Sequence, residues 1–325
     1  MADKAIPEHH PSQVRRVMAI PEVGVLIPLI LLAAVFACCD ASFLNSSSIA
    51  VMLRALAFVG IIAVAQTWLM IAGEIDLSVG SVAGLCAVLS AWSMKEGGLP
   101  VGVGIGLGLA AGAAAGLVNG LVAVRLGIPG FIATLGMLYI ARGLNYLLCK
   151  GYPIYPLPET LTAFGQAEPF GVSAAFLCFV AIAVVGDLAL RRTIYGRMVL
   201  ATGGNLEVAQ LAGIPTRAVK IACYAASGTL SGLAGMLLMA QLNVGQPEIG
   251  VGWELDVIAS VVIGGVSLFG GVGTVAGAVL GLLVMQVVRS GLVVTGVSTH
   301  WQTVSVGAIM IAAVGLDLLR RRARI

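Results

Sequence analysis

Long apolar runs fill the chain from Val23 to Leu319, and they constrain its fold more than any other feature. A helix needs about 17–25 such residues to cross a bilayer. The runs are continuous rather than alternating, which indicates helices instead of barrel strands. The sequence therefore predicts an all-α polytopic membrane protein of about ten transmembrane helices, the eighth of them short. The predicted spans are 22–39, 49–72, 77–94, 101–124, 128–148, 170–190, 218–242, 255–269, 272–294 and 302–319.

The charged residues support this fold class and give its orientation. Only 10% of the 325 residues are charged, whereas a soluble domain carries about 25%. With a cytoplasmic N-terminus, thirteen of the eighteen basic residues fall inside, two fall outside and three lie within spans, as the positive-inside rule favours. Both termini are then cytoplasmic. The net charge of +3 comes from these short clusters and indicates no nucleic-acid partner.

The fourth predicted span carries a glycine every four residues. On a helix this spacing makes one smooth stripe, along which a neighbouring backbone can approach closely. We interpret the stripe as a site of tight helix packing. Its members are Gly104, Gly108, Gly112, Gly116 and Gly120.

The predicted inner segment 191–217 contains a short helix over 206–212. Gly203 and Gly204 interrupt any helix before it, Asn205 can cap it, and Glu207 suits the positive end of its dipole. Gly213 and Pro215 then prevent its continuation. A helix of two turns is unstable alone in water and needs a partner surface. The residues leave open whether that surface belongs to this chain or to another protein.

Two carboxylates stand in the stretch "GEIDLSVGS" over 73–81, although charge is costly near hydrocarbon. The parity of the spans places this stretch at the inner end of the second span. Asp76 or Ser78 can cap the third span, while Gly73 and Gly80 let the chain turn and pack tightly. A role of Asp76 in gating or in the transport path is the alternative.

A second irregular stretch, "QPEIGVGWELD" over 246–256, follows the seventh span. Gln246 and Pro247 break that span at its outer end, and Trp253 suits an interfacial position. Irregular backbone at membrane depth survives where protein buries it or where it lines a wet cavity. Glu254 and Asp256 therefore either cap the next helix or line the outer mouth of a pathway.

Three arginines lie within predicted spans. Arg54 is near a span end and can reach the membrane surface. Arg142 and Arg289 lie deeper, so each should face a partner or a cavity. The candidate partners are Glu74, Asp76, Asn119 and Asn145.

Taken together, these motifs show a resemblance to a known family. Glu207-Val208-Ala209 followed by Gly213 resembles the "EAA…G" loop of ATP-binding-cassette importer permeases. With the stretches 73–81, 203–214 and 246–271 in the same order, the chain is similar to permeases of ribose-type sugar importers from its second span to its C-terminus. Two positions depart from that pattern: Glu74 is usually a small residue there, and Val208 replaces an alanine.

The resemblance implies an inner-membrane permease in a bacterial cell, with a tail over 1–21, a transmembrane permease domain over 22–319 and a basic tail over 320–325. It implies a cytoplasmic ATPase docked on the loop 191–217, a second permease copy or a paralogue, and a periplasmic sugar-binding protein. The cargo would be a monosaccharide or a related polyol, moved by alternating access. The residues implied in coupling are Gly204, Asn205, Glu207, Ala209 and Gly213.

The sequence carries no motif of an enzyme. It has no GxxxxGK[ST] loop, because none of its four lysines follows a glycine, so ATP and Mg²⁺ are expected on a partner ATPase. It has no HExxH or GxSxG motif, and the six cysteines show no metal-ligand spacing. The alternative function is an ion-coupled secondary transporter, in which Glu74 and Asp76 would serve as proton sites.

Overall fold

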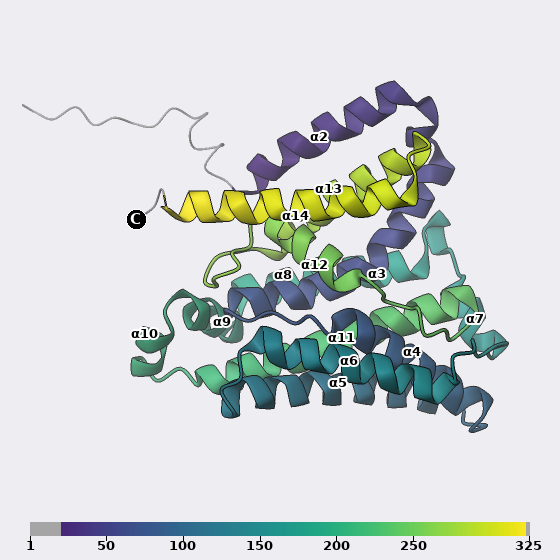
Figure 1. Ribbon diagram of the computed structural model, residues 1–325, viewed down its shortest axis with the longest axis horizontal. Helices are drawn as coiled ribbons and strands as arrows, with labels where there is room; N and C mark the ends of the chain where they lie inside the picture. Colours follow the sequence, from purple (N-terminus) through teal and green to yellow (C-terminus); the bar gives the residue numbers. More distant parts are fainter. Residues whose placement is uncertain (1–20, 323–325) are drawn as a thin grey trace, which may run out of the picture.

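The apolar runs form long helices that lie mostly along one direction of the molecule (Figure 1). The computed structural model describes residues 21–322. The predicted N-terminal tail, except its last residue, and the final three residues of the predicted basic tail lie outside this range. Within it, the only extended pairing is an isolated bridge between Ile154 and Gly245. The predicted all-α class is therefore confirmed.

Each of the ten predicted spans coincides with one helix. Six helices in the described range, α3, α5, α6, α8, α11 and α13, are long and apolar enough to cross a membrane. The helices at the spans are α2 (Pro21–Cys39), α3 (Ser46–Ile71), α4 (Val79–Lys95), α5 (Val101–Arg125), α6 (Gly130–Cys149), α8 (Ala174–Arg192), α11 (Thr216–Leu242), α12 (Trp253–Ile263), α13 (Val275–Val294) and α14 (Thr299–Arg322). The connections hold η1 (Ala41–Leu44), α7 (Glu159–Gly165), η2 (Pro169–Gly171), α9 (Ile194–Gly204) and α10 (Leu206–Leu211).

The short eighth span is a half-length helix. α12 has 11 residues, and at about 1.5 Å per residue it covers roughly half of a 30 Å hydrocarbon layer. α4 is also short, at 17 residues. Each of these two helices follows a non-helical segment, and these two segments form the centre of the site described below.

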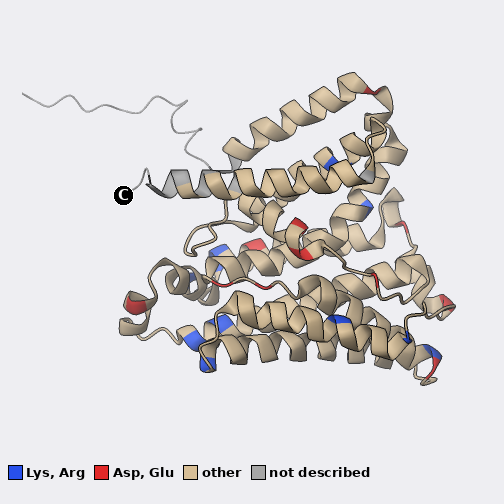
Figure 2. Cartoon of the chain, viewed as in Figure 1, with Lys and Arg blue, Asp and Glu red and all other residues tan. Residues whose placement is uncertain are grey.

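The helix ends divide the molecule into two sides. The short helix α10 lies at one end of the bundle, together with the described C-terminal end of α14, and α7 lies at the opposite end (Figure 1). Charged side chains are few, and most of them lie near the ends of helices (Figure 2). This distribution matches the sequence-based prediction that the basic clusters lie outside the hydrocarbon layer.

The predicted glycine stripe of α5 is a close helix contact. Its five glycines are buried, and α5 packs along α11. A Cβ atom on Gly112 would meet the backbone carbonyl of Gly228, and one on Gly116 would meet that of Tyr224. Only glycine permits this approach, so the packing interpretation is confirmed.

α3 is the central helix of the bundle. It packs against α8, α11, α12 and α13, and its buried side chains, such as Ile61 and Leu69, lie in the largest apolar cluster. Because the first non-helical segment begins where α3 ends, this cluster fixes the position of that segment.

Candidate functional site

The first break, residues 72–78, connects α3 to α4 and is organised around a buried carboxylate. Asp76 is 1% exposed. Its Oδ1 accepts hydrogen bonds from the backbone N–H of Ser78 (2.8 Å) and from the Ser78 hydroxyl (2.6 Å), and its Oδ2 accepts one from the Ser227 hydroxyl (2.9 Å). Asn119 donates to the Ser78 Oγ (2.9 Å). The network thus joins the break to α5 and α11.

The predicted cap of the third span takes a different form. Ser78 occupies the N-cap position of α4, but its side chain makes no capping hydrogen bond, because its hydroxyl donates to Asp76. Asp76 instead accepts hydrogen bonds from Ser78, the residue that precedes the first residue of α4. Gly73 has φ +81°, which lets the chain turn beside Gly203 at the end of α9.

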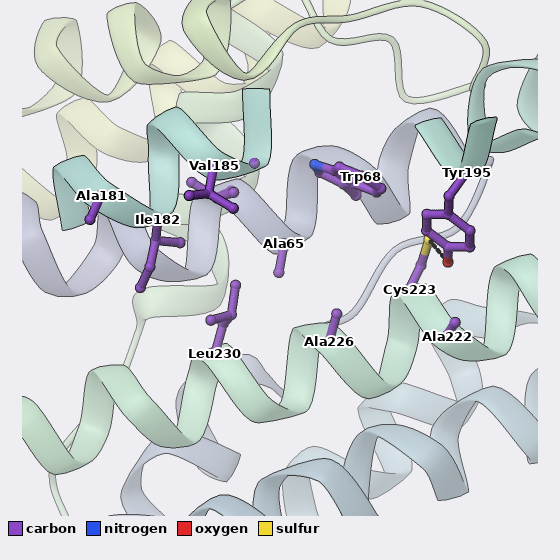
Figure 3. A pocket seen from close by; sticks show the side chains of 12 residues that line it. Ala65, Trp68, Ala181, Ile182, Val185, Tyr195, Ala222, Cys223, Ala226 and Leu230 are labelled. Atoms are coloured by element: carbon purple, nitrogen blue, oxygen red, sulfur yellow. Dashed lines mark hydrogen bonds between the residues drawn. The ribbon is translucent and has the colours of Figure 1, made fainter. Parts of the chain in front are cut away.

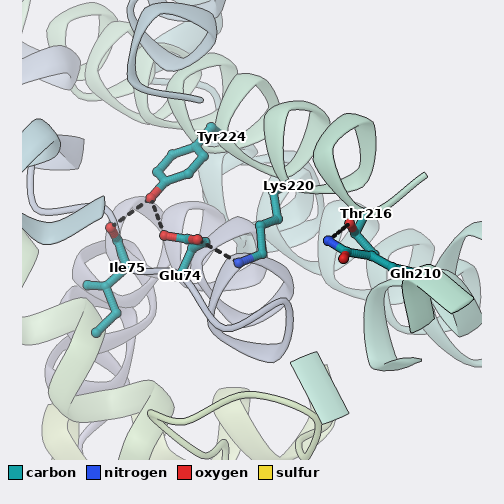
Figure 4. A network of polar contacts seen from close by, with 6 residues as sticks. All are labelled: Glu74, Ile75, Gln210, Thr216, Lys220 and Tyr224. Carbon is teal, nitrogen blue, oxygen red and sulfur yellow. Dashed lines mark hydrogen bonds and ion pairs between the residues drawn. The ribbon is translucent and has the colours of Figure 1, made fainter. Parts of the chain in front are cut away.

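Glu74 is held by two side chains from the first turns of α11. Its Oε1 forms an ion pair with the Lys220 Nζ (2.7 Å), and its Oε2 accepts a hydrogen bond from the Tyr224 hydroxyl (2.9 Å) (Figure 4). The side chains of Glu74 and Lys220 are each 16% exposed. Neither Lys220 nor Tyr224 was predicted as its partner, because the sequence offered Glu74 only as a candidate partner of Arg142 or Arg289. The spacing of Lys220 and Tyr224 at i and i+4 on one helix was the available signal.

The second break, residues 243–252, connects α11 to α12 and is organised around a backbone carbonyl. The Pro247 carbonyl accepts hydrogen bonds from Arg142 Nη1 (2.8 Å) and Asn145 Nδ2 (3.0 Å), both on α6. Gly250 and Gly252 have φ near +80°, which only glycine adopts without strain. A polar group of the irregular backbone is thus hydrogen-bonded by side chains within the protein.

The two breaks meet where α4 and α12 begin. A Cβ atom on Gly80 would lie against the Gly250 carbonyl and 2.6 Å from the Glu254 Oε2. Helix N-termini carry partial positive charge, so they attract oxygen atoms. Five buried side-chain oxygens on α4, α6, α11 and α12 have no hydrogen-bond partner within residues 21–322. They belong to Ser81, Asn145, Ser231, Gln241 and Glu254.

The structure corrects the predicted partners of the deep arginines. Arg289 pairs with Asp256 (2.5 Å), which joins α13 to α12, and Asp256 was not among the candidates. Arg142 binds the Pro247 carbonyl instead of any candidate side chain. The sequence expected Gln246 and Pro247 to break the seventh span, but α11 already ends at Leu242, where Asn243 has φ +58°. The Pro247 carbonyl therefore lies outside any helix and accepts from side chains. Arg54 pairs with Glu168 on a neighbouring loop.

The other residues of the second motif also have defined places. Trp253, expected at an interface, stacks on the buried Phe58 of α3 with ring centroids 6.2 Å apart. Glu254 and Asp256 both lie in the first turn of α12, but the N-cap residue is Gly252, with no side-chain capping hydrogen bond. Of the two carboxylates, only Asp256 has an ion-pair partner in the described range. Gln246 is partly buried beside Pro247.

α10 presents an exposed apolar surface. The Asn205 Oδ1 caps it by accepting from the Val208 N–H (3.0 Å), as predicted, and Glu207 lies in its first turn. The helix ends one residue earlier than expected, and Gly213 follows with φ +79°. Ala209 is buried, whereas Leu211 is 88% exposed. Exposed apolar side chains on so short a helix are typical of a docking surface.

The segment 191–217 is more helical than the sequence predicted. α9 occupies residues up to Gly204 before α10 begins. Gln210 of α10 donates a hydrogen bond to the Thr216 hydroxyl at the start of α11 (3.3 Å). α10 is therefore tied to the helix that holds Glu74 (Figure 4).

Metal ligands do not gather in the described part of the chain. No group of three or more His, Cys, Asp or Glu side chains there could hold a metal ion. All six cysteines are free thiols.

Comparison with known proteins gives consistent relatives. A family model described as branched-chain amino acid transport system / permease component matches residues 48–314. The ribose import permease protein RbsC of Bacillus subtilis (strain 168) is 38% identical, over 91% of this chain and 92% of that protein. The L-arabinose ABC transporter permease protein AraH of Azospirillum brasilense is 35% identical, over 93% of this chain and 88% of that protein.

A third relative is named for a different solute. The autoinducer 2 import system permease protein LsrC of Photorhabdus luminescens is 32% identical, over 91% of this chain and 89% of that protein. No solved structure matches the chain.

Proposed function

The chain belongs to the family of branched-chain amino acid transport system permease components, and from that premise we propose that it is the permease subunit of an ATP-binding-cassette importer for a monosaccharide or a related polyol. The observation that carries the proposal is identity to named import permeases along nine-tenths of the chain. The chain is a multi-pass membrane protein with several apolar helices.

The chemistry of the two breaks supports a neutral, hydroxyl-rich cargo. A sugar is recognised by hydrogen-bonding groups rather than by a paired charge. Glu254, Asn145 and Ser81 each have a side-chain oxygen with no partner within the described residues, near the point where the two breaks meet. The relatives named for L-arabinose and ribose carry solutes of this class by their names.

We propose ten spans with both termini in the cytoplasm of a bacterial cell, so the protein lies in the inner membrane. Ten helices coincide with the ten predicted spans, and an even number of spans puts both termini on one side. The C-terminal end of α14 lies at the same end of the bundle as α10 (Figure 1). That end also holds Arg125 and Arg217, which the positive-inside rule assigns to the cytoplasm.

α10 is the proposed contact with a cytoplasmic ATPase, which binds ATP and Mg²⁺ in place of this chain. The coupling residues are those of the capped helix: Gly204, Asn205, Glu207, Ala209 and Gly213. The other proposed partners are a second permease copy or a paralogue, and a periplasmic sugar-binding protein on the side of α7. Neither nucleic acid nor a cofactor has a role in this proposal.

The contacts suggest how movement of α10 reaches the pathway. Gln210 ties α10 to Thr216, and α11 carries Ser227, which donates a hydrogen bond to Asp76 in the first break. Displacement of α10 by the ATPase would therefore pull on the segment 72–78. Because α4, which follows that segment, abuts Gly250 at Gly80, the movement would change how the two breaks meet and expose the site alternately to each side.

Uptake by proteoliposomes tests the function. The permease is reconstituted with its ATPase and binding protein, and accumulation of labelled pentoses and polyols is measured. We expect uptake only when ATP and the binding protein are both present. Uptake that persists without the ATPase and stops with a proton uncoupler would establish the ion-coupled alternative instead.

Variants of α10 test the coupling role. Glu207→Lys and Gly213→Pro should reduce both ATPase copurification and uptake at least about tenfold, the effect of about 1.4 kcal/mol of lost docking free energy. Glu159→Lys, which places the same change on exposed α7 at the opposite end, is the control for ATPase copurification. If copurification and uptake are both unchanged in the α10 variants, α10 is not the docking helix.

A further inference from the structure

A hollow of about 580 Å³ opens between α8 and α11, with α3 as its floor (Figure 3). α3 packs against both helices, while α8 and α11 share almost no contact in the described chain. Small side chains keep the hollow open: Ala65 on α3, Gly186 on α8, and Ala222 and Ala226 on α11. The hollow is thus a groove within the span region.

The groove lies in the half of the bundle nearest α10. Its α3 residues, Val64 to Trp68, precede the end of that helix at Ile71, and its α11 residues begin at Ala222, soon after that helix starts. In the proposed topology this half corresponds to the inner leaflet. The walls are almost wholly hydrocarbon and match an acyl chain.

The inner end of the groove is formed by two aromatic side chains. Trp68 and Tyr195 stack there with ring centroids 5.6 Å apart, and the Tyr195 hydroxyl donates to the Val219 carbonyl (3.1 Å). This hydrogen bond closes the end of the groove against α11. Aromatic side chains of this kind are typical of the membrane interface, where lipid ester groups lie.

One arginine of α8 flanks this end. Arg192 lies two turns beyond Val185 on the same face of α8. It is exposed and has no ion-pair partner in the described range, whereas the adjacent Arg191 is paired with Asp187. An anionic headgroup would supply the missing negative charge.

We propose that this groove binds one anionic phospholipid of the inner leaflet, with an acyl chain between α8 and α11 and the phosphate at Arg192. A second copy of the chain fits this face less well. A two-fold axis through the face would bring the Arg192 side chains of both copies toward one another, and like charges in apposition are unfavourable.

Fluorescence quenching tests the proposal on the full chain. A variant that keeps Trp68 and replaces Trp92, Trp253 and Trp301 by phenylalanine is reconstituted in vesicles. These vesicles contain phosphatidylglycerol or phosphatidylcholine with the same brominated acyl chains. We expect quenching of Trp68 by both lipids, with an apparent affinity for phosphatidylglycerol at least about fivefold higher, the effect of about one arginine at a membrane surface.

Single substitutions assign the preference. Arg192→Gln should reduce the preference for phosphatidylglycerol severalfold, whereas Arg125→Gln, at the inner end of α5, should leave it unchanged. Ala226→Phe should fill the groove and reduce quenching by both lipids.

Two results would overturn the proposal. Equal quenching by the two lipids would show that Arg192 selects no headgroup. No quenching by either lipid would show that protein, such as a second copy, covers the groove. Both comparisons use the Trp68 protein itself, so they hold even if an arginine variant fails to insert.

Discussion

The break before α4 and the break before α12 meet at Gly80 and Gly250, but their polar groups are satisfied differently. In the first break, the Asp76 carboxylate accepts three hydrogen bonds, and all its donors come from within the chain. In the second break, the fixed point is the Pro247 carbonyl, and the nearby Glu254 Oε2 has no partner in the described range. The first is complete as it stands, whereas the second has capacity left for a ligand.

This difference predicts different roles for the carboxylates of Asp76 and Glu254. A fully hydrogen-bonded buried group fixes one arrangement of the backbone, and its removal leaves donors unsatisfied. A buried oxygen without a partner is costly unless something binds it during function. Stability should therefore depend on Asp76, and transport on Glu254.

The largest expected effect is that of Asp76→Ala. The change leaves the Ser78 N–H and two hydroxyls without their acceptor, so the free energy of unfolding should fall by about 3 kcal/mol or more. Chemical or thermal unfolding of the detergent-solubilised protein measures the loss. Glu254→Ala is the matched variant, expected within about 1 kcal/mol of the parent but defective in uptake. Equal destabilisation by the two changes would remove the distinction between the breaks.

The second largest expected effect is that of a substitution where the two breaks meet, at Gly80 and Gly250. Gly80→Ala adds a methyl group against the Gly250 carbonyl and the Glu254 carboxylate, and overpacking of this kind costs about 1–3 kcal/mol. Gly102→Ala, on α5 with open space around it, is the control and should be neutral or slightly stabilising. Unfolding and uptake are measured together. A Gly80 variant as stable and active as the control would show that the two breaks need no close contact.

The smallest effect is that of the ion pair behind the first break. Lys220→Met should cost about 1 kcal/mol, because it leaves Glu74 partly buried with only Tyr224 as a partner. Glu74→Gly is expected to be tolerated, as the family pattern at that position indicates. The two changes together should cost less than their sum, by about 0.5–1 kcal/mol. Complete loss of uptake in Glu74→Gly alone would give Glu74 a role of its own in transport.

Much of the fold could be predicted from the sequence, because hydrocarbon requires long apolar helices wherever the chain crosses it. The short α12, the Asn205 cap of α10 and the packing role of the α5 glycines are all local features, and each is present. α9 was missed because Gly203 and Gly204 indicate where a helix ends and say little of what precedes them.

Partners distant in the sequence were less predictable. Arg289 with Asp256, and Lys220 with Glu74, depend on which helices lie side by side, and apolar pattern does not specify helix neighbours. The acceptor of Arg142 is a backbone carbonyl, which every residue carries and which no motif reveals. The roles of the motif residues in coupling and transport remain predictions for the uptake experiments.

The glycine contact between α5 and α11 has a consequence for biosynthesis. α5 leaves the ribosome well before α11, so until α11 is inserted the glycine face of α5 can meet only lipid or another helix. A nascent chain that stops before α11 therefore leaves Gly116 and Gly120, whose close neighbours all lie on α11, uncovered. Such truncated chains should be recognised by membrane proteases, while chains that reach Leu242 bury the stripe and escape degradation.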